Sequence, residues 1–426
     1  MRSAKRAIAL IDGEHYASVV RDALAELPYE FAAAYVVGGT EKLRPGGEYG
    51  IPLRDDLEAA IRELEPELVV DLSDEPVLGP RQRFRLASRV LARGVAYEGA
   101  DFRLEPLSFE PFELPSLAVL GTGKRVGKTA VTAHVARKLS ERREVVVLAM
   151  GRGGPEEPVV VDAPPTLESL LELSRAGGHA ASDYLELAAL TGRVTIGCRR
   201  CGGGLAGAVA TSNVSAGLDL ARERRPDLVL FDSSGAAVPP VAVGKRLLVA
   251  DASQDPALVT GYLNAYRILL SDLVVLTRAG EGTRHEDLAR AVSEVKDVPV
   301  VAAALRPRPV APVEGRRVAY FTTAAEHAHD GITRHLREDH GADVACVSGS
   351  LSRRAELARD LERADAEVFV VELKAAAIDV VAEAAVERGI EVVFADNEVV
   401  PLPGQPDLDA ELEALAEASA AEPVSS

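Results

Sequence analysis

The chain has 426 residues, of which 47% are hydrophobic and 27% are charged, a composition typical of a soluble globular protein with more than one domain. Its formal net charge of −18 argues against a nonspecific nucleic-acid binder and against a protein that binds anionic membranes. Three cysteines are too few for a disulfide framework, and no apolar stretch has the length of a secretory signal or a membrane span. We therefore expect a cytoplasmic protein.

The N-terminal third alternates strand and helix patterns, which is typical of βαβ units and a parallel sheet. The expected strands are 7–11, 31–37 and 68–72. One helix is expected to end near residue 26, and two more are expected at 53–65 and 80–94. Ligands of such sheets bind beyond the carboxyl ends of the strands. The turn at 38–42 and the candidate substrate-binding residues fall there: Asp12, Glu14, His15 and Lys42. For the DGEHY segment, which holds Asp12, Glu14 and His15, an Asp-Gly turn with Glu14 in the first turn of a helix is about as good an explanation as a ligand site.

The middle third opens with a strand, a glycine-rich turn and a helix in immediate succession. Backbone N–H groups at a helix N-terminus, together with the helix dipole, favour a bound anion. In this pattern Lys128 reaches the β- and γ-phosphates of a nucleotide, and the Thr129 hydroxyl ligates Mg²⁺. The sequence thus predicts an ATP- or GTP-binding loop, although Thr122 stands where the usual pattern has glycine; a glycine-rich turn without a ligand is the alternative. The expected nucleotide-binding residues are Gly121, Thr122, Gly123, Lys124, Arg125, Val126, Gly127, Lys128 and Thr129.

Charged residues follow the next strands at the same edge of the expected sheet. Arg152 follows a strand expected at 145–150, which places it beside the nucleotide phosphates. Arg199 and Arg200 stand beside three glycines, where guanidinium groups and a close backbone suit an anion. Asp232 ends another apolar strand and is expected to organise Mg²⁺, although such an aspartate taken alone is more often a turn residue.

The arginine pair lies inside a C-x-x-C pattern formed by Cys198 and Cys201. A closed structural zinc site needs four ligands, and the third cysteine is far away in the sequence. We therefore favour an anion cradle over a metal site here.

The rest of the chain continues the alternation of strands and helices. The expected strands of the central sheet are 246–250, 273–277 and 298–302, with helices at 255–270 and 284–295 and a candidate base-binding loop at 277–283. A third α/β segment is expected to have strands near 317–322, 343–347, 367–372 and 391–395. The tail beyond 404 is acidic and rich in alanine, as in a frayed helix or a disordered segment.

Proline-rich stretches at 104–115 and 306–312 are typical of linkers and divide the chain. The expected fold class is α/β: a three-layer parallel-sheet P-loop NTPase domain flanked by two smaller Rossmann-like α/β domains. The expected parts are an N-terminal candidate substrate-binding domain at 1–112, a catalytic P-loop domain at 113–311, a C-terminal α/β domain at 312–403 and an acidic tail at 404–426.

With these pieces placed, the chain resembles the cyclic 2,3-diphosphoglycerate synthetase family. The motifs that carry the resemblance are DGEHY, GTGKRVGKT, CRRCGGGLAG, FDSSGAAVPPV, the RPRP stretch and VELKAAAID, in this order along most of the chain. The central domain alone also resembles dethiobiotin synthetase, whose phosphate loop likewise begins with Gly-Thr.

The resemblance implies ATP-dependent ring closure of 2,3-diphosphoglycerate to its cyclic pyrophosphate, with release of ADP and phosphate. In the family this product accumulates in heat-loving archaea. ATP and Mg²⁺ are the implied cofactors, the anionic diphosphate is the implied small-molecule partner, and a homodimer is expected because related P-loop enzymes are often dimers. Neither a nucleic acid nor a membrane is an expected partner.

The residue inventory suits this chemistry, because joining two phosphates depends on positioning and on charge neutralisation. Lys128, Lys124 and Arg152 are the candidate catalytic residues, and Thr129 and Asp232 are the candidate metal ligands. The candidate acceptor-binding residues are Asp12, Glu14, His15, Lys42, Arg199, Arg200 and Lys245.

Two alternatives use the same loop. A phosphoglycerate kinase-type transfer would stop before ring closure. An ATP-switched protein of the partitioning type would bind a protein partner, but such proteins usually carry a lysine five residues before the loop lysine, and Gly123 stands at that position.

Overall fold

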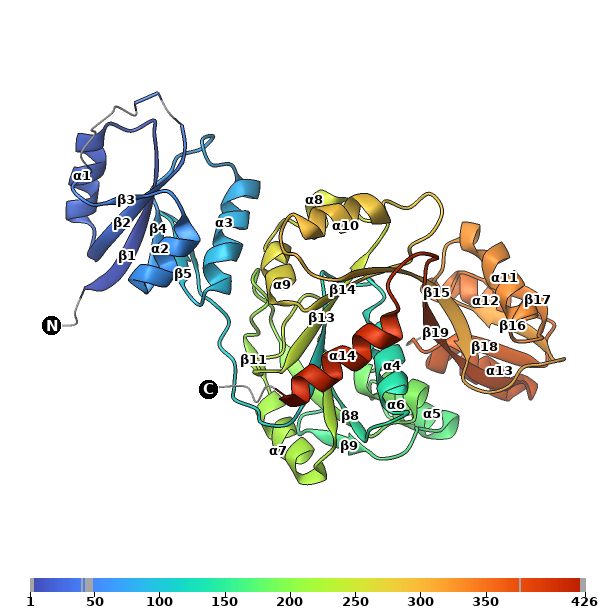
Figure 1. Ribbon diagram of the computed structural model, residues 1–426. Helices are drawn as coiled ribbons and strands as arrows, with labels where there is room; N and C mark the ends of the chain where they lie inside the picture. The colour runs from blue at the N-terminus through green and yellow to red at the C-terminus, as the bar shows by residue number, and fades with distance from the viewer. Residues whose placement is uncertain (1–3, 40, 43–48, 375–376, 422–426) are drawn as a thin grey trace.

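The structure is a computed structural model that describes residues 4–39, 41–42, 49–374 and 377–421. Its described residues form two sheets, a six-stranded one at the N-terminus and a 13-stranded one that runs through the rest of the chain. Figure 1 shows the N-terminal domain as a separate lobe beside the larger body. The α/β class and the parallel strand pairing expected from the sequence are confirmed.

The N-terminal sheet has the strand order β3-β2-β1-β4-β5-β6, with β5 and β6 antiparallel and the other pairs parallel. Its apolar central strands are buried on both sides, as parallel strands covered by helices must be. Its elements are β1 (Lys5–Asp12), α1 (Ala17–Glu26), β2 (Tyr29–Gly38), β3 (Leu53–Arg54), α2 (Leu57–Leu64), β4 (Leu68–Asp71), α3 (Pro80–Ala92), β5 (Ala96–Glu98) and β6 (Arg103–Leu104).

The central domain follows with a sheet in the order β11-β10-β8-β12-β7-β13-β14-β15, in which β7 has neighbours on both sides. Its strands are β7 (Ser116–Gly121), β8 (Val145–Gly151), β9 (Val159–Val161), β10 (Thr195–Cys201), β11 (Thr211–Ser212), β12 (Leu228–Asp232), β13 (Lys245–Asp251), β14 (Leu273–Thr277) and β15 (Val300–Pro309). Its helices are α4 (Lys128–Leu139), α5 (Leu167–Arg175), α6 (Asp183–Thr191), α7 (Val214–Arg224), α8 (Pro256–Val259), α9 (Asn264–Leu270) and α10 (His285–Ser293).

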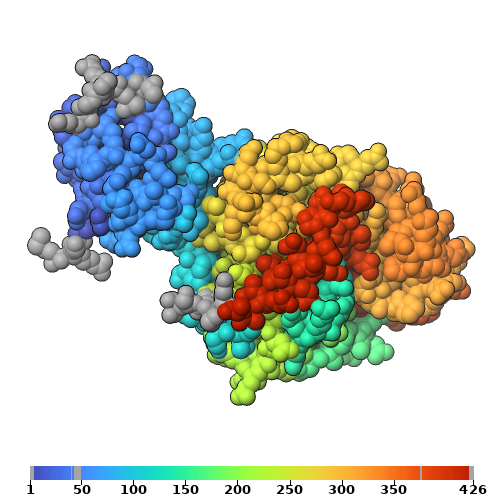
Figure 2. All heavy atoms as spheres, in the orientation of Figure 1, coloured from blue at the N-terminus to red at the C-terminus, as the bar shows by residue number. Residues whose placement is uncertain are grey.

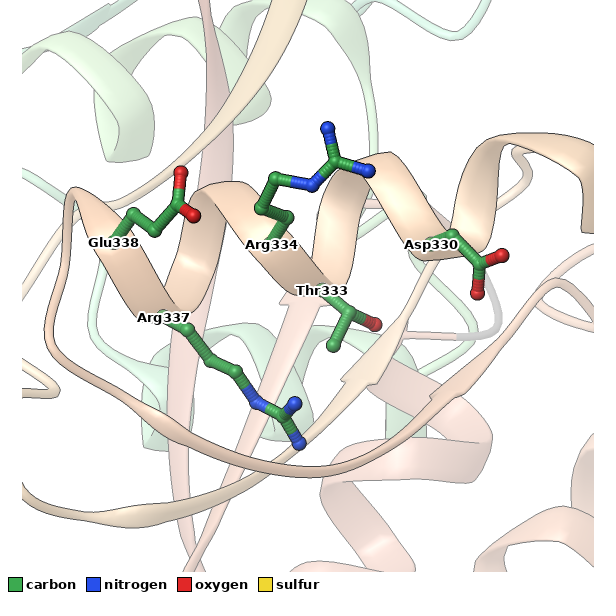
Figure 3. Close-up of a pocket in the computed structure, with 5 residues that line it drawn as sticks. All are labelled: Asp330, Thr333, Arg334, Arg337 and Glu338. Carbon is green, nitrogen blue, oxygen red and sulfur yellow. The ribbon is translucent and has the colours of Figure 1, made fainter.

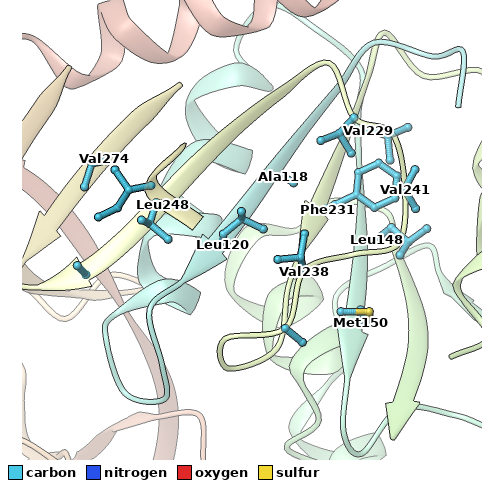
Figure 4. Close-up of a cluster of buried hydrophobic side chains, with 14 of the residues drawn as sticks. Ala118, Leu120, Leu148, Met150, Val229, Phe231, Val238, Val241, Leu248 and Val274 are labelled. Carbon is cyan, nitrogen blue, oxygen red and sulfur yellow. The ribbon is translucent and has the colours of Figure 1, made fainter. Parts of the chain in front are cut away.

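Alternate residues of β7 enter two separate cores, which is why helices cover both faces of the sheet. Leu117 and Val119 pack with α4, whereas Ala118 and Leu120 belong to the opposite core with Phe231. Figure 4 shows this second core, in which side chains from neighbouring strands meet under one face of the sheet. The three-layer arrangement expected for a P-loop domain is therefore present.

The C-terminal segment extends the same sheet in the order β19-β18-β16-β17. Its elements are β16 (Arg317–Phe321), the short helix η1 (Glu326–Ala328), α11 (His329–Glu338), β17 (Asp343–Ser348), α12 (Arg354–Arg363), β18 (Val368–Glu372), the π-helical stretch η2 (Ala377–Ala382), α13 (Glu383–Arg388), β19 (Glu391–Pro401) and α14 (Leu408–Ala421).

The proline-rich stretch expected to be a second linker is instead the end of β15. Its residues pair antiparallel with β19, which joins the central and C-terminal sheets edge to edge. The N–H of Val310 donates to Phe394 O, so the alternating pattern turns the nitrogens of Pro307 and Pro309 toward the other edge of β15. The pairing of β14 with β15 ends at Ala302, so the prolines remove no hydrogen bond from that ladder.

The acidic tail, expected to be frayed or disordered, forms helix α14, which lies across the central domain (red in Figures 1 and 2). Its apolar side chains Leu408, Leu412 and Ala416 are buried in the same core as α4. Its acidic side chains meet the basic residues that follow the phosphate loop: Asp409 Oδ1 lies 3.0 Å from His134 Nε2 on α4. The helix is ordered because both of its faces have partners.

The N-terminal lobe joins the central domain through α3 and α9 and through the proline-rich stretch after β6. Leu107 N donates to the Tyr266 hydroxyl at 3.2 Å, and the Phe112 ring lies 5.5 Å from that of Phe231.

Within the described part of the chain, no helix combines the length and the apolar character that crossing a membrane requires.

Candidate active site

The predicted phosphate loop lies between β7 and α4, and two of its glycines stand where other segments approach closely. A Cβ atom on Gly121 would lie 2.9 Å from the carbonyl oxygen of Gly235. A Cβ atom on Gly127 would lie 2.9 Å from Thr277 Oγ1, and its φ of +82° also favours glycine. Helix α4 begins at the next residue, Lys128, so the N–H groups of its first turn open toward the loop.

Side chains after the neighbouring strands hold this loop in place. Thr277 Oγ1, at the end of β14, donates to Val126 O at 2.7 Å. The next residue, Arg278, donates to the carbonyl oxygen of Arg125 and lies 2.5 Å from Asp251 Oδ2. The sequence predicts a base-binding loop at 277–283. Its first two residues, Thr277 and Arg278, hold the phosphate loop in place through these hydrogen bonds.

Lys128 and Asp232 meet where α4 begins. Lys128 Nζ donates to Asp232 Oδ1 at 2.5 Å, and the same oxygen accepts a hydrogen bond from Thr132 Oγ1 at 2.6 Å. Asp232 ends β12 and is 1% exposed. Burial raises the pKa of its carboxyl group, and the Lys128 ammonium offsets part of that effect. The Lys128 ammonium group, paired with the Asp232 carboxylate, therefore lies where nucleotide phosphates would bind.

Two buried hydroxyl groups beside the loop, Thr122 Oγ1 and Ser233 Oγ, have no hydrogen-bond partner among the described residues. Buried polar groups are almost always bonded, so these positions suit a water or a ligand oxygen. Thr129 is partly buried in the first turn of α4, directly after Lys128. The described residues contain no group of three or more His, Cys, Asp or Glu side chains that could hold a metal ion, so a metal here would need oxygens of the nucleotide or of water.

Sequence reasoning missed Asp183, the first residue of α6. An added Cβ on Gly151, at the end of β8, would lie 3.1 Å from Asp183 Oδ2, so this carboxylate sits at the edge of the sheet that carries the loop. Burial raises the pKa of Asp232, and the charge of Asp183 raises it further. Asp183 has no ion-pair partner among the described residues. Its Ser-Asp pattern before a helix reads from sequence as a helix start only.

Arg200 and Lys124 lie beside the turn after Asp232. Arg200 Nη2 donates to Ser234 O at 2.8 Å, while its Nε is buried with no partner among the described residues. A Cβ atom on Gly235 would lie 3.7 Å from Arg200 Nη2 and 3.9 Å from Lys124 Cγ. Burial lowers the pKa of Arg200, and the nearby charge of Arg152 lowers it further. Positive charge is thus concentrated in front of the loop, as an anionic substrate requires.

Arg199 is separated from Arg200, although the two were expected to form one cradle. Strand β10 continues through both residues, so successive side chains point to opposite faces. The Arg199 side chain is 49% exposed and its Nη2 lies 4.0 Å from Glu156 Oε1. Of this pair, the structure brings Arg200 to the phosphate loop and leaves Arg199 at the surface.

Lys245 lies at the other edge of the sheet from the phosphate loop. It begins β13 and is paired with Leu117, near the start of β7, whereas Gly121 at the loop is paired with Val249. Four residues of strand therefore separate Lys245 from the loop, about 13 Å at the usual rise per residue.

The N-terminal candidates form their own cluster at the carboxyl edge of the first sheet. Asp12 is 1% exposed and accepts hydrogen bonds from His15 Nδ1 at 2.7 Å and from the N–H groups of Glu14 and Asp74 at 3.0 and 2.8 Å. Burial raises the pKa of Asp12, but these hydrogen bonds outweigh it and the pKa is lowered. Lys42 is paired with its neighbouring glutamate, and residue 40 of the same turn lies outside the described residues. The partners of this cluster are residues of its own domain.

The two cysteines near Arg200 do not face each other. Cys198 is buried in the core, where burial raises the pKa of its thiol to about 12, whereas Cys201 is exposed.

A shallow depression along α11 in the C-terminal segment is lined by residues of that one helix, Asp330, Thr333, Arg334, Arg337 and Glu338 (Figure 3). Helix α11 packs against β17 and β15, so the depression is separate from the phosphate loop after β7.

Comparison with known proteins covers all three parts of the chain. Family models described as the N-terminal domain, the P-loop domain and the C-terminal domain of cyclic 2,3-diphosphoglycerate synthetase match residues 6–105, 116–305 and 309–398. Among solved structures, LpxK from Aquifex aeolicus in complex with ATP aligns at 13% identity and a TM-score of 0.40 over 72% of this chain and 90% of that chain, a likeness too distant to bear on function.

Several curated relatives bear the name cyclic 2,3-diphosphoglycerate synthetase. That of Rubrobacter xylanophilus is 49% identical over 93% of this chain and 94% of the relative. Those of Thermococcus gammatolerans and Methanothermobacter thermautotrophicus are 44% and 39% identical over at least 93% of each chain. The similarity extends from the first domain to the last, so the chain belongs to the cyclic 2,3-diphosphoglycerate synthetase family.

Proposed function

We propose that this protein converts 2,3-diphosphoglycerate to its cyclic pyrophosphate, using ATP and releasing ADP and phosphate. The observation that carries the proposal is the convergence at one sheet edge of the phosphate loop, the Lys128–Asp232 pair and the Arg200 guanidinium. The full-length similarity to proteins that bear the synthetase name supports the choice of substrate.

The reaction needs one substrate phosphate to become a leaving group. In the proposed sequence, the γ-phosphoryl group of ATP is transferred to one phosphate of the substrate and ADP departs. An oxygen of the neighbouring phosphate then attacks the phosphorus between the substrate oxygen and the added phosphoryl group. Inorganic phosphate is expelled and the ring closes. Each step moves one phosphoryl group, so the protein contributes positioning and charge stabilisation.

Each basic residue at the loop has a proposed part in this sequence. Lys128 holds the β- and γ-phosphates from within the loop, as in other phosphate loops. Lys124 and Arg152 neutralise the transferred group, because Lys124 lies on the loop and Arg152 follows β8, which pairs with the strand that ends at Asp232. Arg200 contacts the acceptor, because its side chain bonds to the turn that faces the loop.

The residues present also fit a magnesium ion. Thr129 in the first turn of α4 would be a ligand, and the carboxylates of Asp232 and Asp183 would hold the ion directly or through water, since Asp232 Oδ1 is already bonded to Lys128 and Thr132. When bound, the ion neutralises charge on the β- and γ-phosphates. Asp183 enters the proposal because it has no ion pair in the described structure and lies at the same sheet edge.

The remaining sequence-based candidates lie away from the phosphate loop. Asp12, Glu14, His15 and Lys42 would reach the acceptor if the N-terminal lobe moved toward the loop. Arg199 and Lys245 would need a role away from the loop. The expected homodimer rests on resemblance to P-loop enzymes and is tested by light scattering of the purified protein.

The direct test is ADP release measured with ATP, with and without 2,3-diphosphoglycerate. We expect ADP release that depends on the diphosphate and is absent with 3-phosphoglycerate as the sole acceptor. ATP hydrolysis that ignores the diphosphate but responds to an added protein would favour a switch instead.

A further inference from the structure

The VELKAAAID motif of the C-terminal domain reaches into the central domain through one residue. Lys374, two residues after β18, donates from Nζ to Glu186 Oε1 of α6 at 2.7 Å. The Glu186 side chain is 9% exposed, whereas that of Lys374 is 44% exposed. A lysine ammonium has three N–H donors, so a partly exposed lysine on a buried carboxylate keeps donors for a ligand. Residues 375–376, which follow it, lie outside the described residues.

The C-terminal domain and α6 also share a hydrophobic core. Leu185 and Leu190 of α6 are buried in the same cluster as Phe321 and Phe369 of the C-terminal strands. Packed cores transmit displacement because their side chains interdigitate closely. The C-terminal domain and α6 are therefore packed against each other, and the hydrogen bond to Glu186 places Lys374 on that helix.

Helix α6 links Lys374 to the phosphate loop. Glu186 lies three residues after Asp183, so both carboxylates are on one side of the helix. Asp183 lies against Gly151 at the end of β8, next to the strand that carries Asp232. Burial lowers the pKa of Lys374, but the charges of Glu186, Glu372 and Asp183 outweigh it and the pKa is raised, so the lysine is protonated at neutral pH.

The three domains differ in what they bring near the loop. The N-terminal candidates are bonded within their own lobe, and that lobe contacts the central domain through α3 and α9. The C-terminal domain, in contrast, places the Lys374 ammonium on α6, whose first residue lies at the sheet edge that carries the loop.

From this arrangement we infer that Lys374 binds an anionic oxygen of the diphosphate acceptor, so that the C-terminal domain completes the site. The inference rests on the proposed function for the identity of the acceptor. Glu186 is a positioning residue, because it holds the lysine and acts on the acceptor through it. Arg200 and Lys374 would then contact the acceptor from two domains.

The test compares Lys374→Met with Lys374→Arg and with the wild-type chain, by titration calorimetry with 2,3-diphosphoglycerate and, separately, with a non-hydrolysable ATP analogue. We expect Lys374→Met to weaken diphosphate binding about tenfold or more while ATP-analogue affinity changes less than about twofold. Lys374→Arg should retain much of the affinity. Unchanged diphosphate binding in Lys374→Met, or an equal loss for both ligands, would overturn the inference.

A purely structural ion pair is separated by the double variant Lys374→Met with Glu186→Gln. Removing both partners leaves no buried unpaired charge, so the melting temperature lost in Lys374→Met should return. Diphosphate affinity should remain low in the double variant; its recovery would mean that the lysine serves stability alone. Arg354→Met removes a more exposed ion pair with Asp379 in the same domain and should leave both affinities unchanged.

The same titrations distinguish this inference from the proposed function. A wild-type chain that forms the cyclic product but binds the diphosphate no better than Lys374→Met contradicts the inference alone. A wild-type chain that binds the diphosphate tightly without forming the product contradicts the proposed function, and the affinity ratio of the two chains still decides the role of Lys374.

Discussion

Lys128 Nζ and Asp232 Oδ1 are 2.5 Å apart, which joins the first residue of α4 to the last residue of β12 beneath the phosphate loop. The carboxylate holds the ammonium in place before any phosphate arrives. A nucleotide would therefore meet a lysine whose position is already fixed, with little reorganisation needed during the reaction.

Replacing Lys128 with Ala removes this charge and should lower kcat by about 10²–10³-fold or more. Steady-state ADP release measures the effect. Lys138→Ala, on the same helix but paired with Glu141 and Asp409, is the control and should stay within about twofold. Full activity in Lys128→Ala would remove the loop from the mechanism.

The two adjacent arginines of β10 form a matched pair. Arg200→Ala removes the guanidinium that bonds to the turn after Asp232, and we expect kcat/KM for the diphosphate to fall about 10–100-fold. Arg199→Ala removes an exposed side chain whose carboxylate neighbour is 4.0 Å away, and kcat/KM should change less than about twofold. Equal losses in the two variants would contradict the placement of the site on one face of the strand.

Asp183→Asn tests the proposed magnesium site. The variant keeps the shape of the side chain but removes its charge, so more Mg²⁺ should be needed for half-maximal binding of a fluorescent ATP analogue. The titration reports binding directly and needs no turnover. Asp219→Asn, which changes an exposed aspartate on α7 that is paired with Arg222, is the control. An unchanged Mg²⁺ requirement in Asp183→Asn would exclude this carboxylate from the metal site.

The phosphate loop was predictable from sequence because its chemistry is local. Gly121, Lys128 and Thr129 act within one strand–turn–helix unit, and the apolar alternation around them identifies both the strand and the helix. Asp232 was a candidate because it ends an apolar strand that follows a phosphate loop in the sequence, and the structure places its carboxylate 2.5 Å from Lys128 Nζ.

Other features depend on pairings between distant segments. The pairing of β15 with β19 was missed because Pro307 and Pro309 are typical of a linker. A strand accepts these prolines only where their nitrogens point to an edge without a hydrogen-bonded neighbour, and the local sequence does not show which edge that is. Lys374 and Glu186 are 188 residues apart, so no local pattern connects them. The separation of Arg199 from Arg200, in contrast, follows from strand alternation once β10 is known to continue through both.

The C-terminal helix should be required for stability. Leu412 is fully buried in the core beneath α14, so Leu412→Ala should lower the free energy of unfolding by about 2–5 kcal/mol. Urea unfolding followed by circular dichroism measures the change. Leu258→Ala, at a position 48% exposed, should change it by less than about 0.5 kcal/mol. Equal stability of the two variants would mean that α14 does not pack as described.

Asp409 makes the contact between α14 and α4 dependent on pH. The hydrogen bond from His134, together with that from Lys138, lowers the pKa of Asp409 to about 2. Because the folded-state pKa is below the unfolded one, this carboxylate stabilises the fold above about pH 4 and stops doing so as the pH falls toward 2. Asp409→Asn should therefore be less stable than the wild type at pH 7, with a difference that shrinks on acidification. A difference that grows at low pH would contradict the assigned contact.

The most direct test of the central claim is ³¹P NMR of the products formed from ATP and 2,3-diphosphoglycerate by the purified chain. We predict signals of an internal pyrophosphate, of ADP and of free phosphate in equal amounts, all absent with Lys128→Ala. A phosphorylated acceptor without free phosphate, or a diphosphate that stays unchanged while ATP is consumed, would contradict cyclisation.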